Sequence, residues 1–218
     1  MIFSKGLSSV RGIRRFGTIT RVLFKHGLGD VGERLFSVRD GKSRDEADEE
    51  HLFKAGFPSP RRIRLVLEEL GPSFIKLGQL MSTRADLFPP EYIEEFKKLQ
   101  DSVPPIPFSD VKAVMEKELK RPLDSIFASF DPDSIAAASV GQVHMARLFT
   151  GEKVAVKIIR PGIEKKIRED VRLMYNLAEK VERAFEVGRI IGAVNLVKEF
   201  ERIIFRELDM LIEAGVPV

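Results

Sequence analysis

The stretch that most constrains the fold is residues 135–160, where apolar side chains recur with the period of a β-strand. From residue 153 to 159, valine and isoleucine alternate with a second set of side chains that includes Lys157. The pattern predicts three antiparallel strands, over residues 135–138, 142–149 and 153–159. Thr150-Gly151 separates the last two strands, and glycine suits a hairpin because it tolerates positive φ.

Lys157 is the unusual residue of the third strand. An ammonium group in an apolar strand is costly to bury unless an anion meets it. The run Val-Ala-Val-Lys at this place is typical of a protein-kinase N-lobe, where the lysine contacts nucleotide phosphates and pairs with a helix glutamate. The alternative is an edge-strand lysine that extends its amine to water. These four residues alone leave both interpretations open.

A second motif lies in a helix predicted over residues 72–84. Lys76 and Gln79 are three residues apart and therefore share a face of that helix. Gly78 lies between them, and a mid-helix glycine costs stability unless another group must approach closely. A cation, an amide and an open backbone would suit a phosphate or a carboxylate. The alternative is an ordinary solvated helix face.

Residues 1–29 are basic, with six lysines and arginines and no acid, and their apolar residues recur at helical spacing. Such a stretch can lie on an anionic membrane surface, and it also resembles a mitochondrial presequence. The alternative is a helix that packs on the body of the protein with its basic face in water. Residues 40–50 follow as a polar, mostly acidic linker.

Further helices are predicted from proline, serine and apolar spacing. Ser59 and Ser109 are the expected N-caps of two of them. One predicted helix begins at residue 60. The others span residues 91–100, 109–120, 164–186 and 195–214, with a break at 187–192.

Composition excludes several classes of site. The 218 residues contain no cysteine, so a disulfide framework and a cysteine metal site are excluded. The three histidines lack ligand spacing, and we expect no metal site. No apolar run approaches the about 20 residues of a membrane span. The net charge is only +3 without interleaved aromatic and basic residues, so we expect no nucleic-acid partner.

Taken in order, four motifs resemble one family. They are Lys76-Leu-Gly-Gln79, Ala136-Ala-Ala-Ser139, Val154-Ala-Val-Lys157 and Glu207-Leu-Asp209. The chain is similar over nearly its whole length to the UbiB family of atypical protein-kinase-like proteins, which is linked to ubiquinone (coenzyme Q) biosynthesis.

The resemblance implies an α+β fold in which a kinase-like N-lobe, with a short antiparallel sheet and long helices, follows a helical extension. The implied segments are a basic stretch and linker (1–50), the extension (51–130) and the N-lobe (131–218). The implied cofactor is ATP or ADP with Mg²⁺. The implied partners are proteins of ubiquinone biosynthesis or an anionic membrane surface, while the sequence does not set the oligomeric state.

The resemblance also assigns roles to residues. Lys157 would contact the phosphates, and an alanine-rich turn would replace the kinase Gly-rich loop, change nucleotide preference and restrain kinase activity: Ala136, Ala137, Ala138 and Ser139. Each Cβ limits how closely backbone N–H groups approach phosphate oxygens. The hallmark motif Lys76, Gly78 and Gln79 would cover the place of a protein substrate, and the acidic pair Glu207 and Asp209 would meet Lys76. Glu201 would pair with Lys157, with Glu199 as the alternative.

The sequence departs from the family pattern after Glu207-Leu-Asp209. A kinase-like site needs a catalytic-loop Asp, an Asn and a second Asp for Mg²⁺, and no such motifs follow in these 218 residues. We therefore expect an N-terminal half with no catalytic residue, weak or no nucleotide binding and no phosphoryl transfer by itself. The alternatives are a non-catalytic membrane- or partner-binding module and a remnant of an interrupted gene. The expected location is the cytoplasm, with peripheral contact at the inner membrane in a bacterium.

Overall fold

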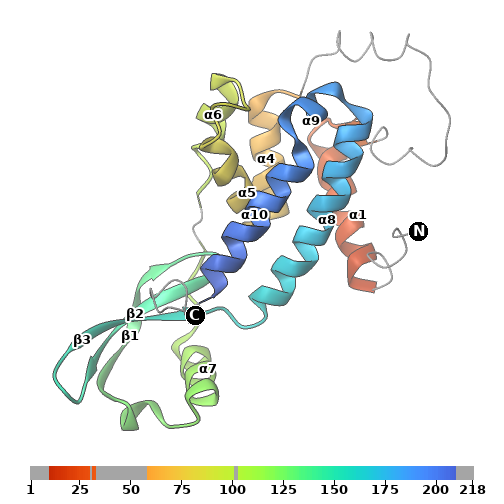
Figure 1. Cartoon of the computed structure of the whole chain (residues 1–218). Coiled ribbons are helices and arrows are strands. Elements are labelled where there is room, and N and C mark those ends of the chain that lie inside the picture. The colour runs from red at the N-terminus through yellow and green to blue at the C-terminus, as the bar shows by residue number, and fades with distance from the viewer. Residues whose placement is uncertain (1–9, 30, 33–57, 101–102, 210–218) are drawn as a thin grey trace, which may run out of the picture. The chain divides into compact units, whose positions relative to one another are not determined.

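The structure, a computed structural model, describes residues 10–29, 31–32, 58–100 and 103–209 (Figure 1). It forms two compact units. Of the described residues, those up to Gln100 and Arg168–Arg206 form unit 1, and those from 103 to 167 together with 207–209 form unit 2. The helix expected at 109–120 shares its core with the strands, and the segments drawn from sequence stay a prediction.

Unit 2 is built on an antiparallel sheet of order β1-β2-β3 (Figure 1). Its elements are α7 (Phe108–Leu119), the 3₁₀ turn η1 (Leu123–Ser125), β1 (Phe127–Ala137), β2 (Gly141–Leu148) and β3 (Lys153–Ile159). β3 has the predicted bounds, while β1 begins well before the predicted residue 135. The β2–β3 hairpin turns at Gly151, whose φ of +95° confirms the need for glycine there.

The two faces of this sheet differ. One face packs on α7 in a cluster that includes Val111, Met115, Ala146 and Ile158. The other face carries Lys157, because successive side chains of a strand point to opposite sides.

β1 is an edge strand and it is irregular. Its pairing with β2 shifts register between Phe130 and Ser134, around the Pro132 that cannot donate a ladder hydrogen bond. Asp133 donates its N–H to Asp131 Oδ1 at 3.0 Å, which closes a local turn in the interrupted stretch.

Unit 1 is helical. Its helices are α1 (Val10–Lys25), α4 (Pro60–Leu70), α5 (Pro72–Ser82), α6 (Pro90–Phe96), α8 (Ile163–Ala184, from Arg168 onward), α9 (Glu186–Ile191) and α10 (Ala193–Leu208, up to Arg206). Proline opens α4, α5 and α6, where its missing N–H costs nothing. α4, α5 and α6 pack against one another, and α1 packs on α4.

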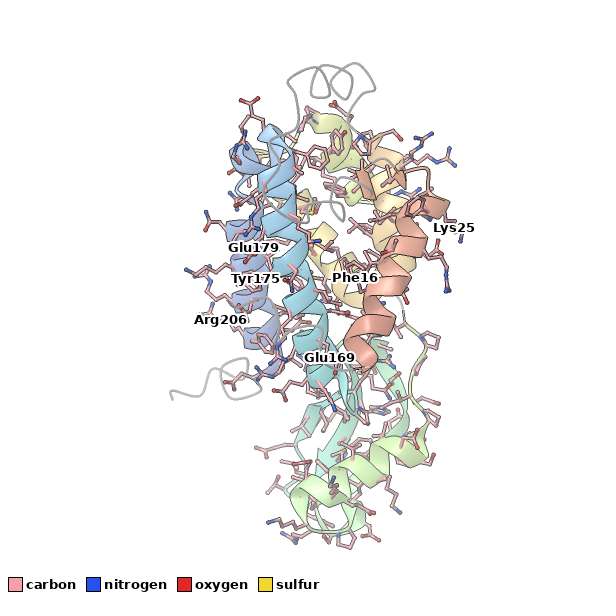
Figure 2. The ribbon with its side chains drawn as sticks, turned by 90° about the vertical axis from the view of Figure 1, so that its right-hand side faces the viewer. Phe16, Lys25, Glu169, Tyr175, Glu179 and Arg206 are labelled. Carbon is pink, nitrogen blue, oxygen red and sulfur yellow. The ribbon has the colours of Figure 1, made fainter. Side chains whose placement is uncertain are left out.

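The apolar face of α1 is buried in unit 1. Ile19, Val22 and Leu23 are almost inaccessible to solvent, whereas Lys25 lies on the exposed side (Figure 2). Burial of about 100 Å² of apolar surface stabilises the packed state by roughly 2.5 kcal/mol, so each of these side chains favours the docked helix. In this part of the chain α1 is thus a packed helix with basic side chains on its exposed side, and the predicted membrane contact of residues 1–29 stays a prediction.

Ser59 is the N-cap residue of α4, as predicted, although its hydroxyl makes no capping bond. Two other local predictions need correction. Ser109 lies inside the first turn of α7, since the helix begins one residue after Pro107. The break predicted at 187–192 is the short helix α9, which ends at Gly192 with φ +66°. Among the described residues, no helix has the length and apolar content needed to cross a bilayer.

Candidate functional site

The candidate site begins with one row across the sheet of unit 2. Lys157 on β3 pairs with Val143 on β2, and Val143 pairs with Ala136 on β1. Directly opposed residues point to the same face, and neighbouring strands lie about 4.8 Å apart. The lysine and the start of the alanine-rich turn therefore share the face that does not pack on α7. Beside them, Ala155 completes a partly exposed apolar surface.

Lys157 also reaches the end of α10. Its Nζ donates to the backbone oxygen of Glu207 at 3.3 Å, in a partly buried position. The last carbonyls of a helix lack intrahelical donors and carry the negative end of the helix dipole. The ammonium therefore stabilises this helix terminus, and the contact brings Lys157 and Glu207 together within unit 2.

The alanine-rich turn is closed by its own backbone. The N–H of Ala138 donates to the oxygen of Gly141 at 2.8 Å, and Ser139 and Val140 between them are buried. Gly141 is required because a Cβ there would lie 2.5 Å from the backbone oxygen of Ile158. A phosphate-binding loop presents unengaged N–H groups. In this arrangement the Ala138 N–H already has an acceptor and is not available to a phosphate. The methyl groups of the turn further limit how closely phosphate oxygens can approach the backbone.

The second motif lies on α5 in unit 1, and its glycine has a packing role. Gly78 is buried, and an added Cβ would overlap Leu99 and lie 2.9 Å from Leu67. Gln79 Nε2 donates to the oxygen of Leu99 at 3.1 Å. The open backbone envisaged for a phosphate is thus covered by Leu99. Lys76 is partly buried on the same helix.

Two of the acidic residues predicted for this site, Glu199 and Glu201, have defined partners in unit 1. Glu201 Oε2 accepts a hydrogen bond from the Tyr175 hydroxyl at 2.7 Å. Burial, and then this bond to Glu201, raise the pKa of Tyr175 to about 12. Glu199 Oε2 forms an ion pair with Arg84 Nη1 at 2.6 Å.

Two predicted pairings stay predictions. Lys157 belongs to unit 2 and its expected partner Glu201 to unit 1. Lys76 likewise belongs to unit 1, while the acidic pair expected to meet it, Glu207 and Asp209, belongs to unit 2.

Sequence reasoning missed a buried ion pair in unit 1. Arg15 Nε on α1 donates to Asp170 Oδ1 on α8 at 2.8 Å, and the Asp170 side chain is only 2% exposed. Arg15 Nη2 also donates to the oxygen of Leu70 at 2.7 Å, and its guanidinium lies 5.5 Å from the centre of the Phe74 ring. The available signal was an acid, Asp170, set on the apolar stripe of a predicted helix.

It also missed two buried polar side chains of unit 2. Gln142 and His144 occupy alternate positions of β2 on the face that packs against α7. Polar residues at core positions of an alternating strand were the signal, since such groups are hydrogen-bonded when buried.

Comparisons with known proteins agree on one family. The family model of the ABC1 atypical kinase-like domain matches residues 98–216. A probable protein kinase UbiB of Marinobacter nauticus is 47% identical over 73% of this chain and 30% of its own length. Proteins of the same name from Azotobacter vinelandii and Pseudomonas putida are each 45% identical, over 72% and 71% of this chain.

The chain thus spans about 30% of the length of the curated relatives it matches. A solved complex of Rv3197 and erythromycin from Mycobacterium tuberculosis is 32% identical, and the match covers 73% of this chain and 40% of that one at a TM-score of 0.40. With the three-stranded kinase-like sheet, the lysine on β3 and a family model that covers more than half of its residues, the chain belongs to the ABC1 atypical kinase-like family and is similar to UbiB proteins.

Proposed function

We propose that this chain is the N-terminal, nucleotide-contacting portion of an ATP-binding atypical kinase- or ATPase-like protein that supports ubiquinone biosynthesis. The observation that carries the proposal is the row formed by Ala136, Val143 and Lys157 on the face of the sheet opposite α7. The role in ubiquinone biosynthesis rests on the likeness to the UbiB family.

The residues of this face suit a nucleotide. The Lys157 ammonium would meet phosphate oxygens, and the apolar surface of Val143 and Ala155 would lie against a base. The closed turn, with Ala138 N–H held by Gly141, would leave less backbone for the phosphates than a Gly-rich loop does. Bound MgATP would supply the transferable phosphoryl group.

The 218 residues by themselves are proposed to bind nucleotide without transferring phosphate. Phosphoryl transfer depends on positioning and electrostatics supplied by a base and by metal-holding acids. The sequence motifs that carry those groups do not occur among these residues. Nucleotide affinity is accordingly expected to be weak, with a Kd on the order of 1 mM.

Titration of the isotope-labelled chain with MgADP and MgATP, followed by NMR, tests the proposal. Shift changes are expected around Lys157, Val143 and Ala136, and Lys157→Met should abolish them. Lys153→Met is the matched control, since Lys153 lies on the same face of β3. Equal loss of the chemical-shift changes in both variants would refute the nucleotide site. Chemical-shift changes that cluster away from this row would refute it too. A micromolar Kd would refute the expectation of weak binding.

A second candidate function, binding to an anionic membrane surface, is favoured by a basic surface on unit 1. Arg21 and Phe24 on α1 are exposed, as are Arg61 and Arg62 on α4. The Arg62 guanidinium lies over the end of α1, 3.7 Å from the Cβ position of Gly27. A basic surface with an exposed aromatic ring fits anionic headgroups.

Vesicle co-sedimentation tests whether this surface binds a membrane or is only exposed to water. Reversing Arg21, Arg61 and Arg62 to glutamate should weaken binding to phosphatidylserine-containing vesicles by at least about a hundredfold, since the loss of each arginine alone costs about 1 kcal/mol. A control with the same charge change in unit 2 replaces Lys117, Lys120 and Lys153 by glutamate. Equal loss in both triple variants would indicate a general charge effect and refute this surface. Deleting residues 1–29 is unsuitable, because it would remove Arg15 from the buried pair.

A further inference from the structure

The proline-rich connector at the start of unit 2 has few backbone donors of its own. Residues 103–107 contain three prolines, so Ile106 is one of only two residues there with an N–H. The side chain of Gln142 satisfies both backbone groups of Ile106. Its Oε1 accepts the Ile106 N–H at 2.7 Å, and its Nε2 donates to the Ile106 oxygen at 3.3 Å. The side-chain amide of Gln142 thus makes the two hydrogen bonds with Ile106 that a neighbouring strand would make in a sheet.

His144 fixes the orientation of that amide. Its Nδ1 lies 2.8 Å from the backbone oxygen of Asp131, and because a carbonyl only accepts, Nδ1 carries the proton. Its Nε2 therefore accepts from Gln142 Nε2, at 2.8 Å. Gln142 is 1% exposed and His144 is fully buried, so a flipped amide would leave buried donors facing each other.

Arg160 bridges the same connector to the alanine-rich turn. Its Nη2 donates to the oxygen of Pro104 at 2.8 Å, and its Nε donates to the oxygen of Ala138 at 2.9 Å. Its own N–H donates to the oxygen of Val140 at 2.9 Å. Because the Ala138 N–H is held by Gly141, both backbone groups of Ala138 are engaged. The planar guanidinium holds two carbonyls in fixed directions, which a lysine cannot do.

We propose that Arg160 and Gln142 are positioning residues that clamp the proline connector to the alanine-rich turn and thereby fix the turn beside Lys157. The part of this inference that concerns nucleotide rests on the proposed function. With the clamp intact, the turn is ordered before a ligand arrives. Without it, the turn must be ordered on binding, and that cost appears as lost affinity.

Amide hydrogen exchange of the whole 218-residue chain, measured residue by residue by NMR, tests the clamp. Arg160→Lys keeps the positive charge but removes the planar guanidinium that binds two carbonyls. Gln142→Met keeps the side-chain volume but removes the amide that binds Ile106. We expect Ala138 to exchange at least tenfold faster in the first variant and Ile106 at least tenfold faster in the second. The matched control is Arg147→Gln, since Arg147 Nη1 also donates to a backbone oxygen, that of Gly151, at 3.0 Å on the same sheet.

Nucleotide titration then tests the consequence. Arg160→Lys should weaken MgADP binding three- to tenfold while the urea midpoint of unfolding stays near that of the parent chain, and Arg147→Gln should change neither. Parental exchange rates at Ala138 and Ile106 in both clamp variants would overturn the clamp. Unchanged affinity together with faster exchange would overturn its effect on the ligand. If the parent chain shows no nucleotide-dependent shifts, the proposed function fails, and the exchange rates alone decide the clamp.

Discussion

The ion pair of Arg15 and Asp170, in which the carboxylate is almost fully buried, should contribute strongly to the stability of unit 1. Arg15→Met removes the guanidinium that pairs with Asp170 Oδ1, while the other carboxylate oxygen, Oδ2, is already buried without a hydrogen bond from the described residues. It also leaves the oxygen of Leu70 without its donor. Breaking a buried pair on one side costs about 3–5 kcal/mol, because an uncompensated charge remains. That is a large part of the about 5–15 kcal/mol that stabilises a typical domain.

Urea unfolding followed by circular dichroism measures this cost. With a slope of about 2 kcal/mol per molar, Arg15→Met should lower the midpoint by about 2 M. The double variant Arg15→Met/Asp170→Leu removes both charges, and replacing a whole buried pair by apolar side chains is often neutral. We therefore expect the double variant to recover most of the loss. The difference between the single and double variants gives the coupling between the two residues.

The control is the exposed pair of Lys25 and Glu69, which also joins α1 to α4. Lys25 Nζ lies 2.8 Å from Glu69 Oε2, but its side chain is 62% exposed. Exposed pairs of this kind often contribute nothing measurable, so Lys25→Met should leave the midpoint unchanged. Equal midpoints for Arg15→Met and Lys25→Met would show that the Arg15 pair is solvated, and the argument from burial would be wrong.

Two further predictions concern single positions. Gly78→Ala should lower the free energy of unfolding by about 1–3 kcal/mol, because the new Cβ overlaps Leu99. Gly17→Ala should instead raise it by up to about 1 kcal/mol, because nothing lies within 4 Å of the new Cβ and alanine favours a helix. Thermal or urea unfolding measures both changes. The pKa of Tyr175 is raised to about 12 in the folded state, by burial and by Glu201, so its contribution is present below the unfolded value of about 10 and is lost as pH rises toward 12. The loss of stability between pH 10 and 12 should be smaller in Tyr175→Phe, and equal losses in the two proteins would contradict this assignment.

The sheet could be predicted where a strand alternates strictly. β3 was predicted over its observed length because valine and isoleucine alternate with Lys157 there. β1 was predicted too short, because the acidic and proline residues at 131–133 read as a loop and only pairing with β2 carries the strand through them. The serine cap predicted for α7 failed since Pro107 can also precede a helix.

The candidate site was less accessible from sequence, because its details depend on distant contacts. Alternation placed Lys157 on the correct face, and the family likeness is the basis of its proposed role. Gly78 looked like an approach site for an anion, but Leu99 from a later segment fills that space. Arg15 and Asp170 are 155 residues apart, and no local pattern links them. The periodicity of a sequence indicates which face of a helix or strand a residue occupies, but it does not indicate which side chain of another element packs against that face.

The irregular middle of β1 has a consequence for how the protein behaves at high concentration. β1 forms an edge of the sheet in the described residues, and an edge strand can recruit a strand from another molecule. Pro132 removes one donor from that edge, the register shift bends it, and two exposed aspartates place like charges where a second copy would dock. The sheet therefore discourages strand-to-strand aggregation along β1 by its own shape and charge.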